Sequence, residues 1–235
     1  MTKGNSGIGL TIAKNFITVG ARRIIIIGRG REKVELAASQ LIAEGQVIES
    51  FTIDRLEGEG IIVDIIQSYI TNVQSHLDFA ERLYKQKGQG APRRKYLINI
   101  SIVAIYMWTG VTPQIPSYGL TKNSGTALMQ QIARDVSPNE LQIVSIYPGS
   151  VLLDTARAAR LDESSLAWNN KNLAGQTVVW ASTPEAKFLH GRFVLANWDI
   201  EELMTSSFRM RLTNDLNFLK VGINGLSEST TSLLV

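Results

Sequence analysis

A tyrosine and a lysine four residues apart have the clearest chemical potential in this sequence. Tyr118 and Lys122 lie in the run SYGLTK, and a helix there would place both side chains on one face. An ammonium group beside a phenol stabilises the phenolate, so Lys122 is expected to lower the pKa of Tyr118 from its usual value of about 10. The pair would then act as a general acid and base near neutral pH.

A glycine-rich turn near the N-terminus is a second candidate site, in this case for a phosphate group. Residues 4–9 read GNSGIG and run directly into a predicted helix. Glycines let the backbone approach a pyrophosphate, and a helix N-terminus offers N–H donors and partial positive charge. The alternative is a frayed glycine-rich terminus capped by Ser6. The candidate residues are Gly4, Asn5, Ser6, Gly7, Ile8 and Gly9.

The composition argues against several other kinds of site. The chain has no cysteine, which excludes disulfides, thiolate metal sites and a cysteine nucleophile. His76 and His190 show no metal-ligand spacing and no nucleophile elbow, so neither a metal site nor a serine hydrolase triad is expected. The formal net charge is only +3, and the basic residues are scattered, which argues against nucleic-acid binding.

The length and the terminal residues suggest one globular domain. The 235 residues, 44% of them hydrophobic, are enough for a sizeable core and predict a single domain over residues 1–235. The opening run MTKGNSGIGL does not have the pattern of a signal peptide, and no stretch approaches the roughly 20 apolar residues of a membrane-spanning helix. A cytoplasmic location without membrane contact is therefore expected.

Strand patterns alternate with helix patterns along the chain. The run RIIIIG is a continuous β-branched segment, typical of a strand that is covered on both faces. The alternation predicts a three-layer, doubly wound α/β fold with a parallel sheet, in which ligands bind beyond the carboxyl ends of the strands. The expected strands are 23–28, 47–54, 96–101, 141–147 and 191–196, and the expected helices are 7–19, 31–44, 60–87, 117–135 and 185–189.

These features occur in an order that resembles the short-chain dehydrogenase/reductase family. The glycine turn, the Tyr118–Lys122 pair, Pro148-Gly149 and the run GRFVLANWD at 191–199 carry the resemblance, which is greatest to fungal members and covers nearly the whole chain. It implies a Rossmann-type fold and an oxidoreductase that acts on a carbonyl or a secondary alcohol. Tyr118 would donate a proton to the substrate, and Lys122 would lower the pKa of Tyr118 and bind the nicotinamide ribose.

The resemblance implies further site residues. Asn72 matches the asparagine that holds a proton-relay water, and Asp54 matches an acidic residue near the adenine. Arg29 follows the second family strand, where a cation suits a 2′-phosphate and an acidic residue would bind the free hydroxyl. NADP is therefore favoured over NAD. The family's common assembly implies a homodimer or homotetramer. The loop that would contact the nicotinamide carboxamide contains Pro148, Gly149 and Val151.

Three substitutions depart from the family pattern. Lys3 stands where the first turn glycine belongs. Ile102 stands at the usual position of the catalytic serine, so Ser101 is carried as the candidate hydroxyl and Thr109 as another. Leu153 stands where a threonine is expected. The next threonine, Thr155, is two residues further on.

A larger departure concerns the sheet. The chain lacks the family's first strand and the Asn-Asn-Ala-Gly segment with its fourth strand, which predicts a break between the strand at 23–28 and the strand at 96–101. Weak or absent activity follows, and the alternative function is an inactive or repurposed member that serves as a binding or scaffold protein, or a truncated gene product. The substrate would be small and apolar, although the residues that suggest this also suit a plain core: Met107, Trp108, Ile115, Leu152, Leu161 and Trp168.

Overall fold

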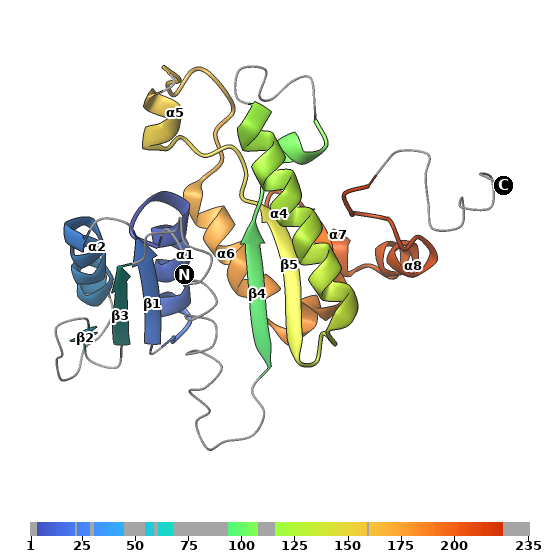
Figure 1. Cartoon of the computed structure of the whole chain (residues 1–235), viewed down its shortest axis with the longest axis horizontal. Coiled ribbons are helices and arrows are strands. Elements are labelled where there is room, and N and C mark those ends of the chain that lie inside the picture. The colour runs from blue at the N-terminus through green and yellow to red at the C-terminus, as the bar shows by residue number, and fades with distance from the viewer. Residues whose placement is uncertain are drawn as a thin grey trace. The chain divides into compact units, whose positions relative to one another are not determined.

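The structure, a computed structural model, divides into two compact units, each with its own three-stranded sheet (Figure 1). The first unit contains Met1–Arg93 and Ser150–Val179, and the second contains Arg94–Gly149 and Trp180–Val235. The prediction of a single domain over 1–235 stays a prediction. The residues that the structure describes are 4–21, 23–28, 31–44, 55–58, 61–67, 94–107, 116–158 and 160–222.

The first unit is a small sheet with helices packed against it. Its strand order is β1-β3-β2, with β3 parallel to β1 and antiparallel to β2. Helix α6 begins in this unit and ends in the other. The elements are α1 (Gly7–Thr18), β1 (Arg23–Gly28), α2 (Arg31–Glu44), β2 (Arg55–Gly58), β3 (Ile61–Gln67), α5 (Asp154–Ala158) and α6 (Lys171–Ala181).

The isoleucine run of β1 supplies the core of this first unit. Ile24 and Ile26 are two residues apart, so they face the same side of the sheet, and both are buried. They form one cluster with Ala13 of α1 and with Val34 and Leu41 of α2. One face of the β-branched run is therefore buried, and the predicted cover of the other face stays a prediction, because the side chains of residues 25 and 27 lie outside the description.

The second unit has a fully parallel sheet in the order β4-β5-β6. Figure 1 shows α4 lying across β4 and β5. On the opposite face of β5, Gln142 Nε2 donates to the carbonyl of Ala181 at 2.8 Å. The elements are β4 (Lys95–Ile100), the 3₁₀ helix η1 (Val103–Ile105), α4 (Pro116–Asp135), β5 (Leu141–Tyr147), the 3₁₀ helix η2 (Pro184–Leu189), β6 (Arg192–Leu195), α7 (Ile200–Met204) and α8 (Ser206–Asn214).

A buried arginine ties the segment after α8 to the sheet. Arg192 of β6 is 8% exposed, and its guanidinium donates to the carbonyls of Leu212 at 3.2 Å, Leu216 at 2.9 Å and Phe218. Burial lowers the pKa of this guanidinium below its usual value, but these backbone acceptors compensate for the lost water.

Most predicted elements are found. Three elements have the predicted bounds: the strands at 23–28 and 141–147 and the helix at 31–44. Five further elements differ from their predicted bounds by one residue at one or both ends. One of these five, η2, is a 3₁₀ helix. The predicted helix over 60–87 is wrong in its first part, because residues 61–67 form β3. The run IIVDIIQ is rich in β-branched residues, which favour a strand. The predicted strand 47–54 and residues 68–87 lie outside the described residues.

The predicted break in the sheet is confirmed for the strands that the structure describes. Strand β1 belongs to one sheet and β4 to another. Strand β3 pairs with β1 from Arg23↔Ile62 to Gly28↔Gln67. The neighbour of β1 is therefore a segment that the sequence pattern had assigned to a helix. The parallel strands and the helices packed on them confirm the predicted α/β class.

Candidate active-site residues

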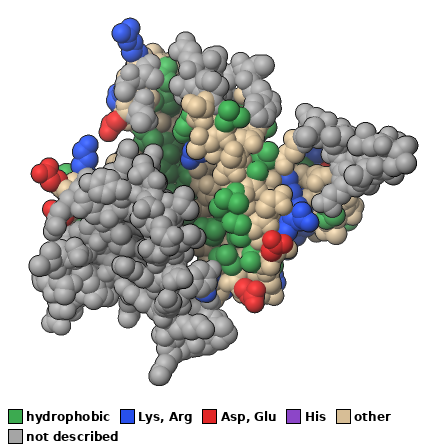
Figure 2. All heavy atoms as spheres, in the orientation of Figure 1, with side chains coloured by type: hydrophobic (Ala, Val, Ile, Leu, Met, Phe, Trp, Pro, Cys, Tyr) green, Lys and Arg blue, Asp and Glu red, His purple; other side chains and the backbone are tan. Residues whose placement is uncertain are grey.

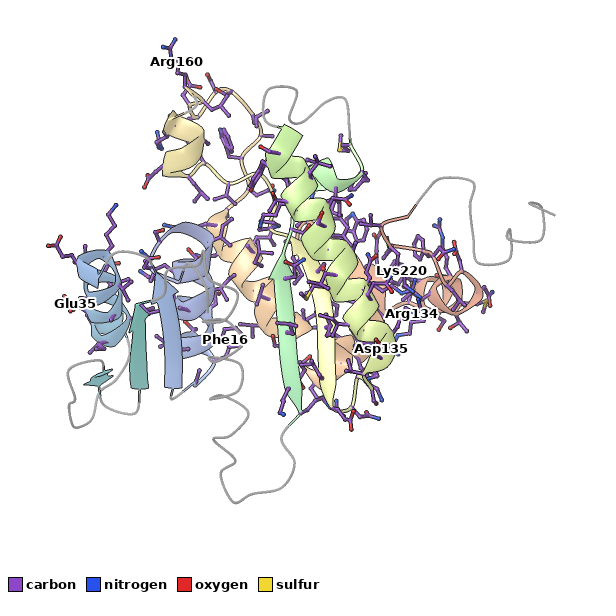
Figure 3. All side chains as sticks on the ribbon, viewed as in Figure 1. Phe16, Glu35, Arg134, Asp135, Arg160 and Lys220 are labelled. Carbon is purple, nitrogen blue, oxygen red and sulfur yellow. The ribbon has the colours of Figure 1, made fainter. Side chains whose placement is uncertain are left out.

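The start of α4 carries the Tyr118–Lys122 pair. The helix begins at Pro116, whose fixed φ and missing N–H suit a first helical turn. Lys122 Nζ donates to the carbonyl of Ile100, the last residue of β4, at 2.7 Å. Lys122 therefore lies at the carboxyl end of β4, as predicted. The labelled Arg134 and Asp135 mark the other end of α4 in Figure 3.

The phenol of Tyr118 is partly accessible, and its pKa moves in the direction opposite to the prediction. The side chain is 44% exposed, and its partial burial raises the pKa above the ordinary value of 10.0, because burial disfavours the charged phenolate. The lowering expected from Lys122 is not found. The phenol therefore carries its proton at neutral pH, which is the form that a proton donor requires.

Ser101 lies among buried polar groups under α4. Its side chain is 4% exposed, and its Oγ lies 2.6 Å from Thr126 Oγ1. Asn99 Nδ2 donates to Ser145 Oγ at 3.1 Å in the same group. Ile102 has an extended backbone, so its side chain leaves the chain on the side opposite to Ser101. The catalytic role of Ser101 stays a prediction.

The loop after β5 begins with a proline and a left-handed glycine. Pro148 and Gly149 are buried, and Gly149 has φ +88°, in the left-handed region that favours glycine. In the first unit, Ser150 and Asn169 exchange two hydrogen bonds: Ser150 N donates to Asn169 Oδ1 at 2.9 Å, and Asn169 N donates to Ser150 O. The sequence patterns did not single out Asn169, which belongs to no motif, yet its two hydrogen bonds to Ser150 close the segment between these residues.

The glycine turn has the properties of an anion site. Gly7 begins α1 with φ +53°, where a side chain would strain the backbone. Ser6 is the N-cap residue, but its side chain makes no capping hydrogen bond. The first-turn N–H groups of α1 thus have no side-chain acceptor at the cap, which suits an anionic ligand. This geometry does not support the alternative of a Ser6-capped terminus.

Leu153 lies near this same turn. A Cβ built on Gly7 would lie 3.3 Å from Leu153 Cδ2. The apolar residue that replaces the family's threonine therefore occupies the space beside Gly7, in the turn that would bind phosphate. Thr155, the displaced threonine, lies in α5.

The other residues named in the sequence analysis either lie outside the described part of the chain or are not among its buried core residues. Met107 and Leu161 are exposed, so a plain core role is wrong for these two. His190 connects β5 with α4. Its Nδ1 accepts a hydrogen bond from Ile143 N at 3.2 Å, and its Nε2 lies 2.9 Å from the carbonyl oxygen of Ala133. The residues that lie outside the description are Lys3, Arg29, Asp54, Asn72, His76, Trp108, Thr109 and Ile115.

The described part of the chain contains neither a metal-binding cluster nor a membrane-spanning helix. Among these residues there is no group of three or more histidine, cysteine, aspartate or glutamate side chains able to hold a metal ion. No helix there is both long and apolar enough to cross a membrane.

The uncapped glycine turn before a helix, the parallel strands and the Tyr118–Lys122 pair together point to the class of α/β oxidoreductases. Solved structures share the fold. A short-chain type dehydrogenase/reductase from Mycobacterium ulcerans superposes with a TM-score of 0.65 at 18% identity, covering 83% of this chain and 86% of that one. RhlG of Pseudomonas aeruginosa, in an NADP active-site complex, has a TM-score of 0.64 at 16% identity, covering 83% and 92%.

Curated fungal proteins are similar to this chain over most of its length. A short chain dehydrogenase/reductase of Claviceps purpurea is 28% identical over 257 aligned residues, covering 95% of this chain and 85% of the relative. The short chain dehydrogenase/reductase nsrO of Aspergillus novofumigatus is 27% identical, covering 95% and 87%. No family model matches the chain. These relatives confirm the predicted resemblance: the chain is similar to fungal short-chain dehydrogenase/reductases, and by that resemblance it is an oxidoreductase.

Proposed function

We propose that the chain is an NADP-dependent oxidoreductase that reduces a carbonyl group of a small apolar molecule or, in reverse, oxidises a secondary alcohol. One observation carries the proposal. Tyr118 and Lys122 share the start of α4, and Lys122 Nζ is held on the carbonyl at the end of β4. A partly accessible, protonated phenol on the same helical turn as an ammonium group is suited to general acid catalysis.

In the proposed reaction, Tyr118 donates its proton to the carbonyl oxygen of the substrate. Lys122 stabilises the phenolate that remains, because a nearby cation favours the charged form. Asn72 would hold the water that returns a proton to Tyr118. In this proposal Ser101, the predicted catalytic hydroxyl, is placed outside the proton path, because its Oγ lies 2.6 Å from Thr126 Oγ1.

The first unit would bind the cofactor. The left-handed Gly7 and the uncapped N-terminus of α1 fit a pyrophosphate. When bound, the nicotinamide supplies a hydride to the carbonyl carbon. Further contacts would come from Asp54 near the adenine, and from the residues that match the nicotinamide and ribose contacts of the family: Tyr118, Lys122, Pro148, Gly149 and Val151. Solved structures with the same fold include complexes with NADP.

Arg29 would set the preference for NADP. A guanidinium binds a 2′-phosphate through two donors, and one such charge-assisted contact of about 1.5–3 kcal/mol corresponds to roughly ten- to hundredfold discrimination. Arg29→Asp should therefore reverse the preference between NADPH and NADH. Fluorescence titration of both nucleotides measures it, and an unchanged preference would remove Arg29 from the assignment.

A second candidate function is a family member that binds ligands without turnover. The observation that favours it is the packing of Leu153 against Gly7, together with the divided sheet. NADPH oxidation with a panel of ketones and quinones separates the two candidates, and we expect weak turnover. If NADPH binds but no member of the panel is reduced, the second candidate is favoured.

The proposed enzyme would form a homodimer or homotetramer. Hydrophobic side chains lie at the surface over α4 (Figure 2), where Leu120 and Leu128 are 57% and 55% exposed. An exposed apolar helix face supports an interface at this helix. Sedimentation velocity of the protein, and of a Leu120→Asp variant, tests the assembly.

A further inference from the structure

We propose that Ser101 and Thr126 form a hydroxyl pair that positions the start of α4, so that both are positioning residues for Tyr118 and Lys122. The roles of Tyr118 and Lys122 rest on the proposed function, but the hydroxyl pair itself does not. Ser101 is 4% exposed and Thr126 is fully buried. Their oxygens are 2.6 Å apart, which is the distance of a strong O–H···O hydrogen bond.

The neighbouring contacts determine which hydroxyl donates. Thr126 Oγ1 donates to the carbonyl of Lys122 at 2.9 Å, and this bond uses the only hydrogen of the threonine hydroxyl. This contact favours Ser101 as the donor of the hydrogen bond to Thr126. Asn99 Nδ2 is a second donor to Thr126 Oγ1, at 3.5 Å. The threonine hydroxyl thus donates one hydrogen bond and accepts two.

This arrangement holds Lys122 at two points. Its carbonyl is bound by Thr126, one helical turn further on, and its ammonium group is bound by the carbonyl of Ile100. Ser101 is fixed in turn, because its N–H donates to the carbonyl of Ile146 in β5 at 2.8 Å. A shift of α4 along the sheet would break buried hydrogen bonds that no water replaces, so the hydroxyl pair sets where Tyr118 stands.

The same arrangement distinguishes Ser101 from a catalytic hydroxyl. Its one hydrogen is committed to Thr126, so Ser101 cannot donate it at the same time to a substrate carbonyl. Loss of the hydroxyl should therefore loosen the helix start rather than remove a step of the reaction.

Hydrogen exchange of the backbone amides in residues 118–126 tests the inference without turnover. Thr126→Val removes the hydroxyl and keeps the shape, and Ser101→Ala removes the donor. Each should speed exchange in this segment about tenfold, since a lost buried hydrogen bond corresponds to about a factor of ten. Thr126→Ser keeps the hydroxyl and should exchange like the natural protein. The double variant should be no faster than the faster single variant, because both changes break one coupled unit.

Thr177→Val is the matched control. Thr177 is also a buried helical threonine whose hydroxyl donates four residues back, to the carbonyl of Leu173 at 2.9 Å. Its loss should leave exchange at 118–126 unchanged. If Thr126→Val does not fold, the comparison of Ser101→Ala with the natural protein decides the matter by itself.

A second readout is the ultraviolet titration of the Tyr118 phenol, taken as the difference from Tyr118→Phe. A loosened helix start admits water, so Ser101→Ala and Thr126→Val should bring the pKa of Tyr118 down toward its ordinary value of 10.0. Unchanged exchange and titration in both variants would overturn the inference. So would a loss of turnover beyond about a hundredfold in Ser101→Ala with exchange unchanged, since that identifies a catalytic hydroxyl. Failure of the proposed function would appear separately, as normal turnover in Tyr118→Phe.

Discussion

The surroundings of the two candidate sites differ in kind. In the second unit, Lys122, Ser101 and Thr126 lie in a connected set of buried hydrogen bonds that favours one arrangement. In the first unit, the glycine turn has no side-chain cap at its helix N-terminus, and a Cβ added to Gly7 would meet the side chain of Leu153. The proposed group that assists proton transfer, Lys122, is thus held by hydrogen bonds, whereas the proposed cofactor turn has an apolar neighbour.

The largest effect should come from Tyr118→Phe. The change removes the proton donor and leaves the ring in place, so turnover should fall by about 10²–10⁴-fold while the affinity for NADPH stays within about twofold. Steady-state kinetics and fluorescence titration measure the two quantities. Equal losses of turnover and affinity would make Tyr118 a packing residue and would remove the contrast between the two units.

Leu153→Thr tests the apolar side of the comparison. The substitution removes methyl groups from the surface of Gly7 and supplies a hydroxyl donor, so NADPH should bind about tenfold more tightly, as expected for one added hydrogen bond to a charged group. Leu153→Val is the control, because it shortens the side chain without adding a donor. If both variants bind NADPH equally well, the added hydroxyl does not contribute to binding, and only the size of the side chain beside Gly7 affects the affinity.

A pair of helical glycines compares the packing of the two units. A Cβ on Gly175 of α6 would lie 2.7 Å from Asn15 Cγ of α1, so Gly175→Ala should destabilise the protein by about 1–3 kcal/mol. Gly125 of α4 has nothing within 4 Å of such a Cβ, so Gly125→Ala should stabilise by about 0.5–1 kcal/mol. Thermal unfolding measures both changes. The same sign for the two variants would contradict the close approach of Asn15 to Gly175.

The smallest effect concerns pH. Because the folded state raises the pKa of Tyr118, it retains the proton more firmly than the unfolded state. The associated stability is fully present below the unfolded pKa of about 10 and is lost as pH rises through the folded value. The rate of carbonyl reduction should therefore not fall because Tyr118 loses its proton until the pH exceeds 10.0. A decline near neutral pH that Tyr118→Phe abolishes would show that Lys122 lowers the pKa after all.

Local patterns predicted much of both units. The isoleucine run predicted β1, and the spacing of Tyr118 and Lys122 predicted their common place at the start of α4. Both signals are short-range, since a β-branched run and a four-residue spacing carry their structural meaning within one element.

The sequence could not predict contacts made between distant segments. The run at 61–67 was assigned to a helix because its place in the chain outweighed its β-branched residues, and its partner β1 lies far back in the sequence. The packing of Leu153 on Gly7 and the bond between Ser101 and Thr126 join residues that no motif connects. The pKa of Tyr118 depends on the burial of its ring, which a four-residue spacing does not reveal.

The binding of Arg192 has a consequence for how this unit tolerates sequence change. The acceptors of its guanidinium are backbone carbonyls at 212, 216 and 218, which every amino acid provides. The side chains of that segment are therefore free to vary among relatives without loss of these contacts. Arg192 itself is not free to vary, because a shorter or uncharged residue would leave several carbonyls in the interior without a hydrogen-bond donor. Selection to keep these hydrogen bonds thus acts on the single codon of Arg192, while the side chains of the segment that contains residues 212, 216 and 218 can diverge.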